Sequence, residues 1–119
     1  MLVVSVKVPP HPLVLQALLE GLAAASYVQL RRYALPRLYA SGVYYQREPK
    51  GRERWQTAIE TYQRGIGDCE DLTAWRVAEL RMDGEPARGV VIPTGPRRYH
   101  ALVERADGSL EDPSRRLRR

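Results

Sequence analysis

A chain of 119 residues, 44% of them hydrophobic, is long enough to bury one core and too short for two, so we expect a single soluble domain. Its one cysteine excludes an intramolecular disulfide framework and fits a reducing compartment. The formal net charge of +5 is spread thinly, apart from four arginines among the last five residues. We expect those arginines to form a frayed, solvated end, because no basic stripe with interleaved aromatic residues accompanies them.

The first third of the chain predicts an extended arm followed by helices. Residues 2–8 are rich in valine and favour a short strand. Apolar residues then recur at helical spacing from 13 to 33, and Pro36 begins a shorter helix that ends at Ala40. The segment 41–52 contains glycine and proline and predicts a loop. Within it, only Val43, Tyr44 and Tyr45 favour a brief strand.

The N-terminal segment does not resemble a secretion signal, because it lacks a basic start and runs into a cluster of prolines. The apolar stretch from Leu13 to Val28 is interrupted by Glu20 and is shorter than a typical bilayer span. We therefore expect a cytoplasmic protein without a membrane partner. Export as part of a larger particle is the alternative.

The rest of the chain predicts two helices and then strands. A helix is expected from Glu53 to Arg64, ended by Gly65 and Gly67, and a second from Cys69 to Met82. After these helices the periodicity changes to that of strands, at residues 87–92 and 99–104. A hairpin turn at 106–109 then leads into a short strand that stops at Pro113. Helices followed by strands indicate an α+β fold with an antiparallel sheet.

Cys69 stands at the predicted start of a helix, inside the stretch Gly67-Asp68-Cys69-Glu70-Asp71-Leu72. A thiol at this position meets unpaired backbone N–H groups and the positive end of the helix dipole, which predicts a lowered pKa. His100 follows in a strand, and Asp112 opens the turn after the last strand. This order suits a thiol nucleophile, its base and the carboxylate that orients the base. The hairpin places Leu102 or Val103 opposite Asp112 or Pro113, with His100 slightly beyond, which permits the pairing without requiring it.

These three segments resemble the transglutaminase-like superfamily of papain-fold cysteine enzymes. The resemblance covers about residues 42–117 of a single 1–119 domain, with residues 1–41 as an N-terminal strand and helices. Compact members of this superfamily, with the same sequence at the helix start and a C-terminal Glu-Asp-Pro-Ser motif, are familiar among phage and prophage open reading frames. The resemblance implies a papain-like core whose central helix begins at the cysteine.

By position, the resemblance makes Cys69 the nucleophile, His100 the general base and later acid, and Asp112 the orienter of the imidazole. The backbone N–H of Cys69 is a natural oxyanion donor. The second donor stays open among Gln63, Tyr44, Tyr45, Gln46, Trp55 and Gln56, and of these we expect Trp55 to pack in the core. No cofactor is expected. Asp68 and Glu70 could hold calcium, but we prefer their complementarity to the helix dipole and expect no metal. His11 is expected at the surface.

The first hypothesis for function is a cysteine hydrolase acting on a peptide or amide, with transfer to an amine as the other outcome of the same acylation step. The second is a phage-type structural or adaptor protein that keeps the fold without needing catalysis. The third and weakest is a basic nucleic-acid-binding module that uses the C-terminal arginines. The expected partner is a protein or peptide substrate, and the sequence does not indicate an oligomeric state.

Overall fold

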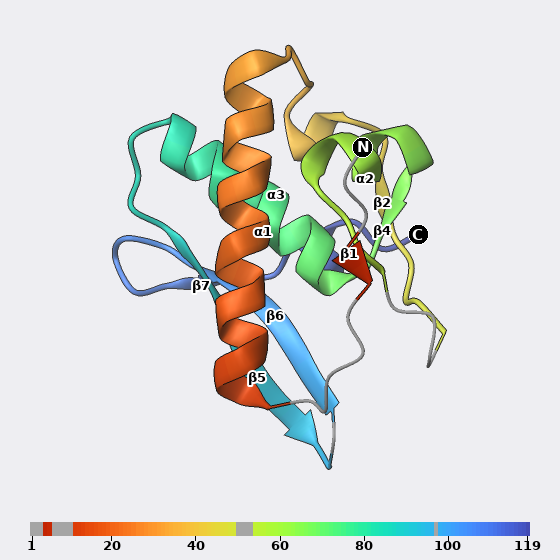
Figure 1. The fold of residues 1–119 in the computed structure, drawn as a ribbon, viewed down its shortest axis with the longest axis vertical. Coiled ribbons are helices and arrows are strands. Elements are labelled where there is room, and N and C mark those ends of the chain that lie inside the picture. The colour runs from red at the N-terminus through yellow and green to blue at the C-terminus, as the bar shows by residue number, and fades with distance from the viewer. Residues whose placement is uncertain (1–3, 6–10, 50–53, 97) are drawn as a thin grey trace.

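The computed structural model describes residues 4–5, 11–49, 54–96 and 98–119. The helices and strands follow in the order β1 (Val4–Ser5), α1 (Pro12–Arg32), η1 (Leu38–Ala40), β2 (Tyr44–Tyr45), β3 (Arg54–Trp55), α2 (Ala58–Arg64), β4 (Ile66–Gly67), α3 (Cys69–Met82), β5 (Arg88–Gly95), β6 (Arg98–Glu104), β7 (Leu110–Glu111) and α4 (Pro113–Arg116). The helices come mainly before the strands of the largest sheet, which is compatible with the predicted α+β class (Figure 1). The expectations for residues 1–3, 6–10, 50–53 and 97 lie outside the described residues.

Helix α1 confirms the predicted N-terminal helix, with Pro12 in its first turn. His11 is exposed, as expected, and caps the helix because its Nδ1 accepts a hydrogen bond from the Leu13 N–H at 3.2 Å. At 21 residues, α1 is long and apolar enough to cross a membrane by length and composition, unlike the shorter stretch considered from the sequence. Core helices of soluble proteins have the same property, and α1 packs one face on α3 and β5 (Figure 1).

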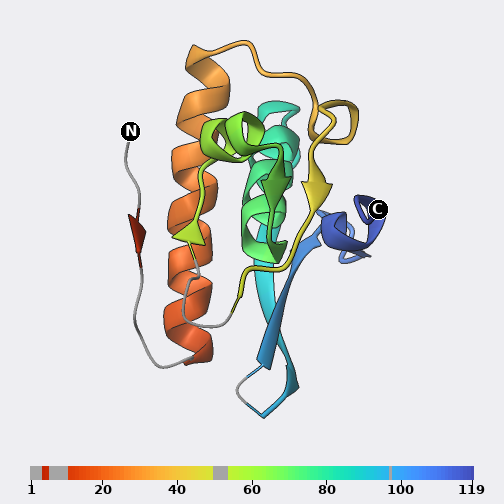
Figure 2. The ribbon, with the colours of Figure 1, turned by 90° about the vertical axis from the view of Figure 1, so that its right-hand side faces the viewer.

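Helix α3 is the central element, because it is buried on nearly every side. One face joins α1 and the sheet in a core made of Leu19, Leu22, Ala23, Ala74, Val77, Leu80, Ala87, Ala101 and Val103. The other face joins a second cluster, made of Leu38, Val43, Ala58, Leu72 and Trp75. In Figure 2, α3 lies between α1 on one side and α4 on the other. The sequence predicted one apolar face and did not anticipate the buried polar residues Glu70, Asp71, Thr73 and Glu79.

Strands β5, β6 and β7 form the predicted antiparallel sheet, in that order. The register pairs Val91 with Ala101 and Ile92 with His100, and Val103 pairs with Glu111 on the other edge of β6. The pairing predicted between β6 and the strand after the hairpin turn is therefore confirmed to within a residue. Gln16 of α1 covers the outer edge of β5, since its side chain bonds Gly89 O and the Val91 N–H.

The helix predicted from Glu53 begins later, at Ala58. Trp55 belongs instead to β3, where it pairs with Val4 of β1, and the next N–H, that of Gln56, donates to the buried Asp71 carboxylate at 2.7 Å. A second unexpected pair is parallel, between β2 and β4. These two-residue strands are held by partners distant in the sequence, which local periodicity does not report.

The C-terminal arginines are not the frayed end expected from the sequence. Residues 113–116 form α4, and the N–H of Tyr45 donates to Leu117 O at 2.8 Å, which ties the end of the chain to β2. The guanidinium of Arg116 lies 4.0 Å from the centre of the Tyr39 ring, and that of Arg119 lies 4.2 Å from the centre of the Tyr44 ring. Two of the four arginines thus pack on aromatic faces.

Replacing Gly89 with alanine is expected to destabilise the protein by about 1–3 kcal/mol, because β5 and α1 are in close contact there. A Cβ at Gly89 would lie 2.6 Å from Leu19 Cδ2 and 2.8 Å from Leu19 Cγ. Gly95→Ala in the same strand is the matched control, since its nearest neighbour would be Arg98 Cδ at 3.9 Å. Urea unfolding measures both, and equal stability of the two variants would contradict this packing.

Candidate active site

Cys69 is the first residue of α3, where the sequence predicted a helix start. Gly65 ends α2 in the left-handed conformation, with φ 76°, and turns the chain through β4 toward the new helix. Asp68 caps α3, and its own N–H donates to Asp71 Oδ2 at 3.1 Å in a capping box. The capping box therefore fixes the backbone position of Cys69 at the helix start.

The surroundings of the sulfur oppose the thiolate, contrary to the sequence prediction. Burial is the largest cause that raises the pKa of the Cys69 thiol, and the negative charges of Glu70 and Asp68 add to it. The thiol donates a hydrogen bond to Glu70 Oε2 at 3.3 Å. Among the main groups that act on the sulfur, only the backbone N–H of Ala101 lowers the pKa of the thiol. Desolvation and the neighbouring acidic side chains outweigh the helix dipole, so these surroundings favour the thiol over the thiolate. Burial also raises the pKa of Glu70.

Cys69 meets strand β6 at the edge beside His100. Val91, the partner of Ala101 on β5, turns its N–H outward to Gln16 Oε1, as in a non-hydrogen-bonded antiparallel pair. The Ala101 N–H therefore points away from β5, toward the edge where β7 pairs only with residues 103 and 104. The N-terminal end of α3 packs against that edge and brings the Cys69 sulfur to the backbone N–H of Ala101.

His100 and Asp112 form a close pair. His100 Nε2 and Asp112 Oδ2 lie 2.9 Å apart, and both side chains are 29% exposed, so solvent or a substrate can reach them. With the carboxylate accepting from Nε2–H, Nδ1 is left as the acceptor nitrogen of the ring. In the described part of the chain, the hydrogen bonds join the imidazole to Asp112 and the sulfur to Glu70, and none joins the sulfur to the imidazole.

Asp112 is positioned by two neighbouring contacts. Its Oδ1 accepts from the Arg115 N–H at 3.3 Å, which makes Asp112 the N-cap of α4. The preceding residue, Glu111, accepts from Arg76 Nε of α3 at 2.7 Å. The end of β7 is therefore fastened to the same helix that carries Cys69, although the sequence separates Asp112 from Cys69 widely.

Two of the candidate oxyanion donors have hydrogen-bond partners in the free protein. The N–H of Cys69 donates to Asp68 Oδ1 at 2.7 Å and is occupied in the free protein. Gln56 is buried, and its amide N–H groups donate to Ile66 O and Asp71 Oδ2. Trp55 packs against the core, as expected. Of the remaining candidates, Tyr45 is half-buried, and burial together with the charge of Asp68 raises its pKa, so it lies in the same electrostatic surroundings as the sulfur.

Asp68, Cys69 and Glu70 present their oxygen and sulfur atoms within 4.8 Å of one another. The Asp68 oxygens already accept from the N–H groups of Cys69 and Glu48, and Glu70 accepts from the thiol. These contacts account for the cluster, and we assign no metal to it. Sequence reasoning missed the roles of Glu70 and Ala101 at the sulfur, although each adjoins a residue it had named.

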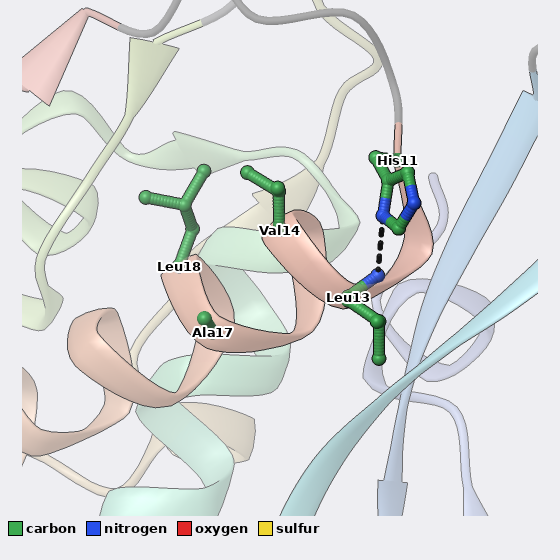
Figure 3. Close-up of a pocket in the computed structure, with 5 residues that line it drawn as sticks. All are labelled: His11, Leu13, Val14, Ala17 and Leu18. Atoms are coloured by element: carbon green, nitrogen blue, oxygen red, sulfur yellow. Dashed lines mark hydrogen bonds between the residues drawn. The ribbon is translucent and has the colours of Figure 1, made fainter.

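A separate hollow lies at the start of α1, away from these residues. It is open and apolar, with a volume of about 550 Å³, and is lined by His11, Leu13, Val14, Ala17 and Leu18 (Figure 3). Leu13 is 75% exposed at its rim. None of its lining residues belongs to the site around Cys69.

Comparison with known proteins gives no relative: no family model, no curated protein and no solved structure matches the chain. The functional argument therefore depends on the arrangement of Cys69, His100 and Asp112.

Proposed function

We propose that the protein is a small cysteine hydrolase of the transglutaminase-like, papain-fold type, acting on peptides or carboxamides in the cytoplasm. The observation that carries the proposal is the His100–Asp112 pair at 2.9 Å, next to the Ala101 N–H that faces the Cys69 sulfur. A thiol at a helix start, with an imidazole held by a carboxylate on the adjoining strand, supports a role in acyl transfer.

In the proposed reaction, Nδ1 of His100 takes the thiol proton as the Cys69 sulfur bonds to the substrate carbonyl carbon. The tetrahedral intermediate then breaks its C–N bond, and His100 returns the proton to the leaving amine. Water, deprotonated by His100, attacks the resulting thioester, and the thiol is restored as the acid leaves. Transfer to an amine would differ only in this last nucleophile. Because Cys69 starts as a thiol, proton removal accompanies attack and does not precede it.

The test is incubation with tryptic peptides of a whole-cell lysate, followed by mass spectrometry of new termini, deamidated side chains and cross-links. Wild-type protein is expected to give products that Cys69→Ala does not give. Products that persist unchanged with Cys69→Ala would contradict the proposal.

A second candidate is a phage-type structural or adaptor protein that does not need catalysis. The observation in its favour is that the thiol is hydrogen-bonded to Glu70 and the imidazole to Asp112, with no hydrogen bond described between the sulfur and the imidazole. Under this alternative, no peptide is altered by the wild-type protein.

A further inference from the structure

Glu70 is the closest polar partner of the candidate nucleophile. Its side chain follows Cys69 in the first turn of α3, is 8% exposed, and accepts the thiol hydrogen bond at Oε2. The carboxyl is therefore held against the sulfur in a place where water does not screen their interaction.

The groups that face the sulfur are mostly acidic. Helix α3 and its cap supply Asp68, Glu70 and Asp71, and β2 supplies the phenol of Tyr45. Strand β6 supplies the Ala101 N–H, with His100 next to it and Asp112 beyond. Arg47 acts on Tyr45, but no cation is among the main influences on the thiol. Burial also raises the pKa of the Glu70 carboxyl, with the charges of Asp71 and Asp68 adding to it. Both groups therefore resist ionisation, and a thiolate beside an ionised Glu70 would place two negative charges in one buried site.

We propose that Glu70 is a positioning residue that restrains Cys69. Its carboxyl oxygen accepts the hydrogen bond of the thiol in the free protein, and the sulfur must leave Glu70 before His100 can take the thiol proton. This inference rests on the proposed role of Cys69 as the nucleophile. No bond is made or broken in the resting contact, since the thiol donates to the carboxyl oxygen and the proton stays on sulfur. Substrate binding that displaces the sulfur from Glu70 toward His100 would release the restraint.

The test is the rate at which iodoacetamide alkylates the single thiol between pH 6 and 10, in wild type and in Glu70→Gln. The amide keeps the size of the side chain and cannot ionise. Because burial raises the pKa of Glu70, its charge opposes the thiolate mainly in the upper part of this pH range. We therefore expect the midpoint of alkylation to shift to lower pH and the rate at pH 9 to rise at least about tenfold. Glu79→Gln is the matched control. It also removes a buried carboxylate from α3, one that accepts the Leu38 N–H away from the sulfur, and should change the rate less than about twofold.

A rate in Glu70→Gln equal to or below that of wild type would overturn the inference. If that variant does not fold, the S–H stretching band of wild-type protein decides instead. The inference predicts a hydrogen-bonded S–H band that persists above pH 9, and loss of the band by pH 8 would contradict it.

The two proposals can fail separately. If Cys69→Ala abolishes peptide products while Glu70→Gln leaves alkylation unchanged, the restraint is wrong and the hydrolase stands. If Glu70→Gln accelerates alkylation and wild-type protein alters no peptide, the restraint stands and the hydrolase is wrong.

Discussion

Replacing His100 with alanine is expected to slow peptide cleavage by about 100- to 10,000-fold, which is the usual contribution of a positioned general base. The thiol pKa is raised by its surroundings, so the free protein holds little thiolate and depends on a base during attack. The measurement is the single-turnover rate on a peptide identified in the cleavage screen.

His100→Ala should leave the fold intact, because the imidazole is partly exposed and its described hydrogen bond is the one to Asp112. Thermal unfolding within a few degrees of wild type is the control. Asp112→Asn is the companion variant, since it keeps the size of the side chain and removes the charge that fixes the imidazole tautomer. A rate in His100→Ala close to that of wild type, with the fold preserved, would exclude the imidazole as the base.

At pH 5, Asp71→Ala is expected to lower the free energy of unfolding by about 1–3 kcal/mol or more, because it leaves buried donors unsatisfied in a domain whose total stability is typically about 5–15 kcal/mol. The fully buried carboxylate accepts from Gln56 N at 2.7 Å, Gln56 Nε2 at 3.0 Å and Asp68 N at 3.1 Å. Truncation would leave these donors without an acceptor. Urea unfolding measures the loss, and a change below about 1 kcal/mol would contradict the assigned role of Asp71.

Asp71 also predicts the direction of the pH dependence. Burial raises its pKa to about 7, against roughly 3.9 in an unfolded chain, although the N–H donors act to lower it. The folded state therefore binds more protons than the unfolded state between about pH 4 and 7, and the contribution of Asp71 to stability falls as pH rises through that window. Asp71→Asn removes this titration, so its unfolding free energy should depend less steeply on pH than that of wild type.

The sequence was sufficient for features that depend on local order. The bounds of α3 follow from the Gly67-Asp68 turn, the acidic first turn and the helical spacing, and the structure has the predicted start at Cys69. The length of the hairpin between β6 and β7 permitted the approach of His100 to Asp112, which the structure has. Both predictions needed only residues close together in the chain.

Features set by distant contacts could not be predicted in this way. Trp55 and Gln56 leave the expected helix because β1 and Asp71 hold them in an extended path. The pKa of Cys69 moves opposite to the prediction because burial depends on how α3 packs against β6. The packing of Arg116 and Arg119 on tyrosine rings likewise depends on where α4 meets η1 and β2.

The most direct measurement of the central claim is the intact mass of the protein after acid quench of a reaction with a cleaved peptide. The account predicts an acyl group on wild-type protein, in a hydroxylamine-sensitive thioester that fragmentation places at Cys69. Peptide cleavage that proceeds at the wild-type rate in Cys69→Ala, with no acyl group on the protein, would contradict it.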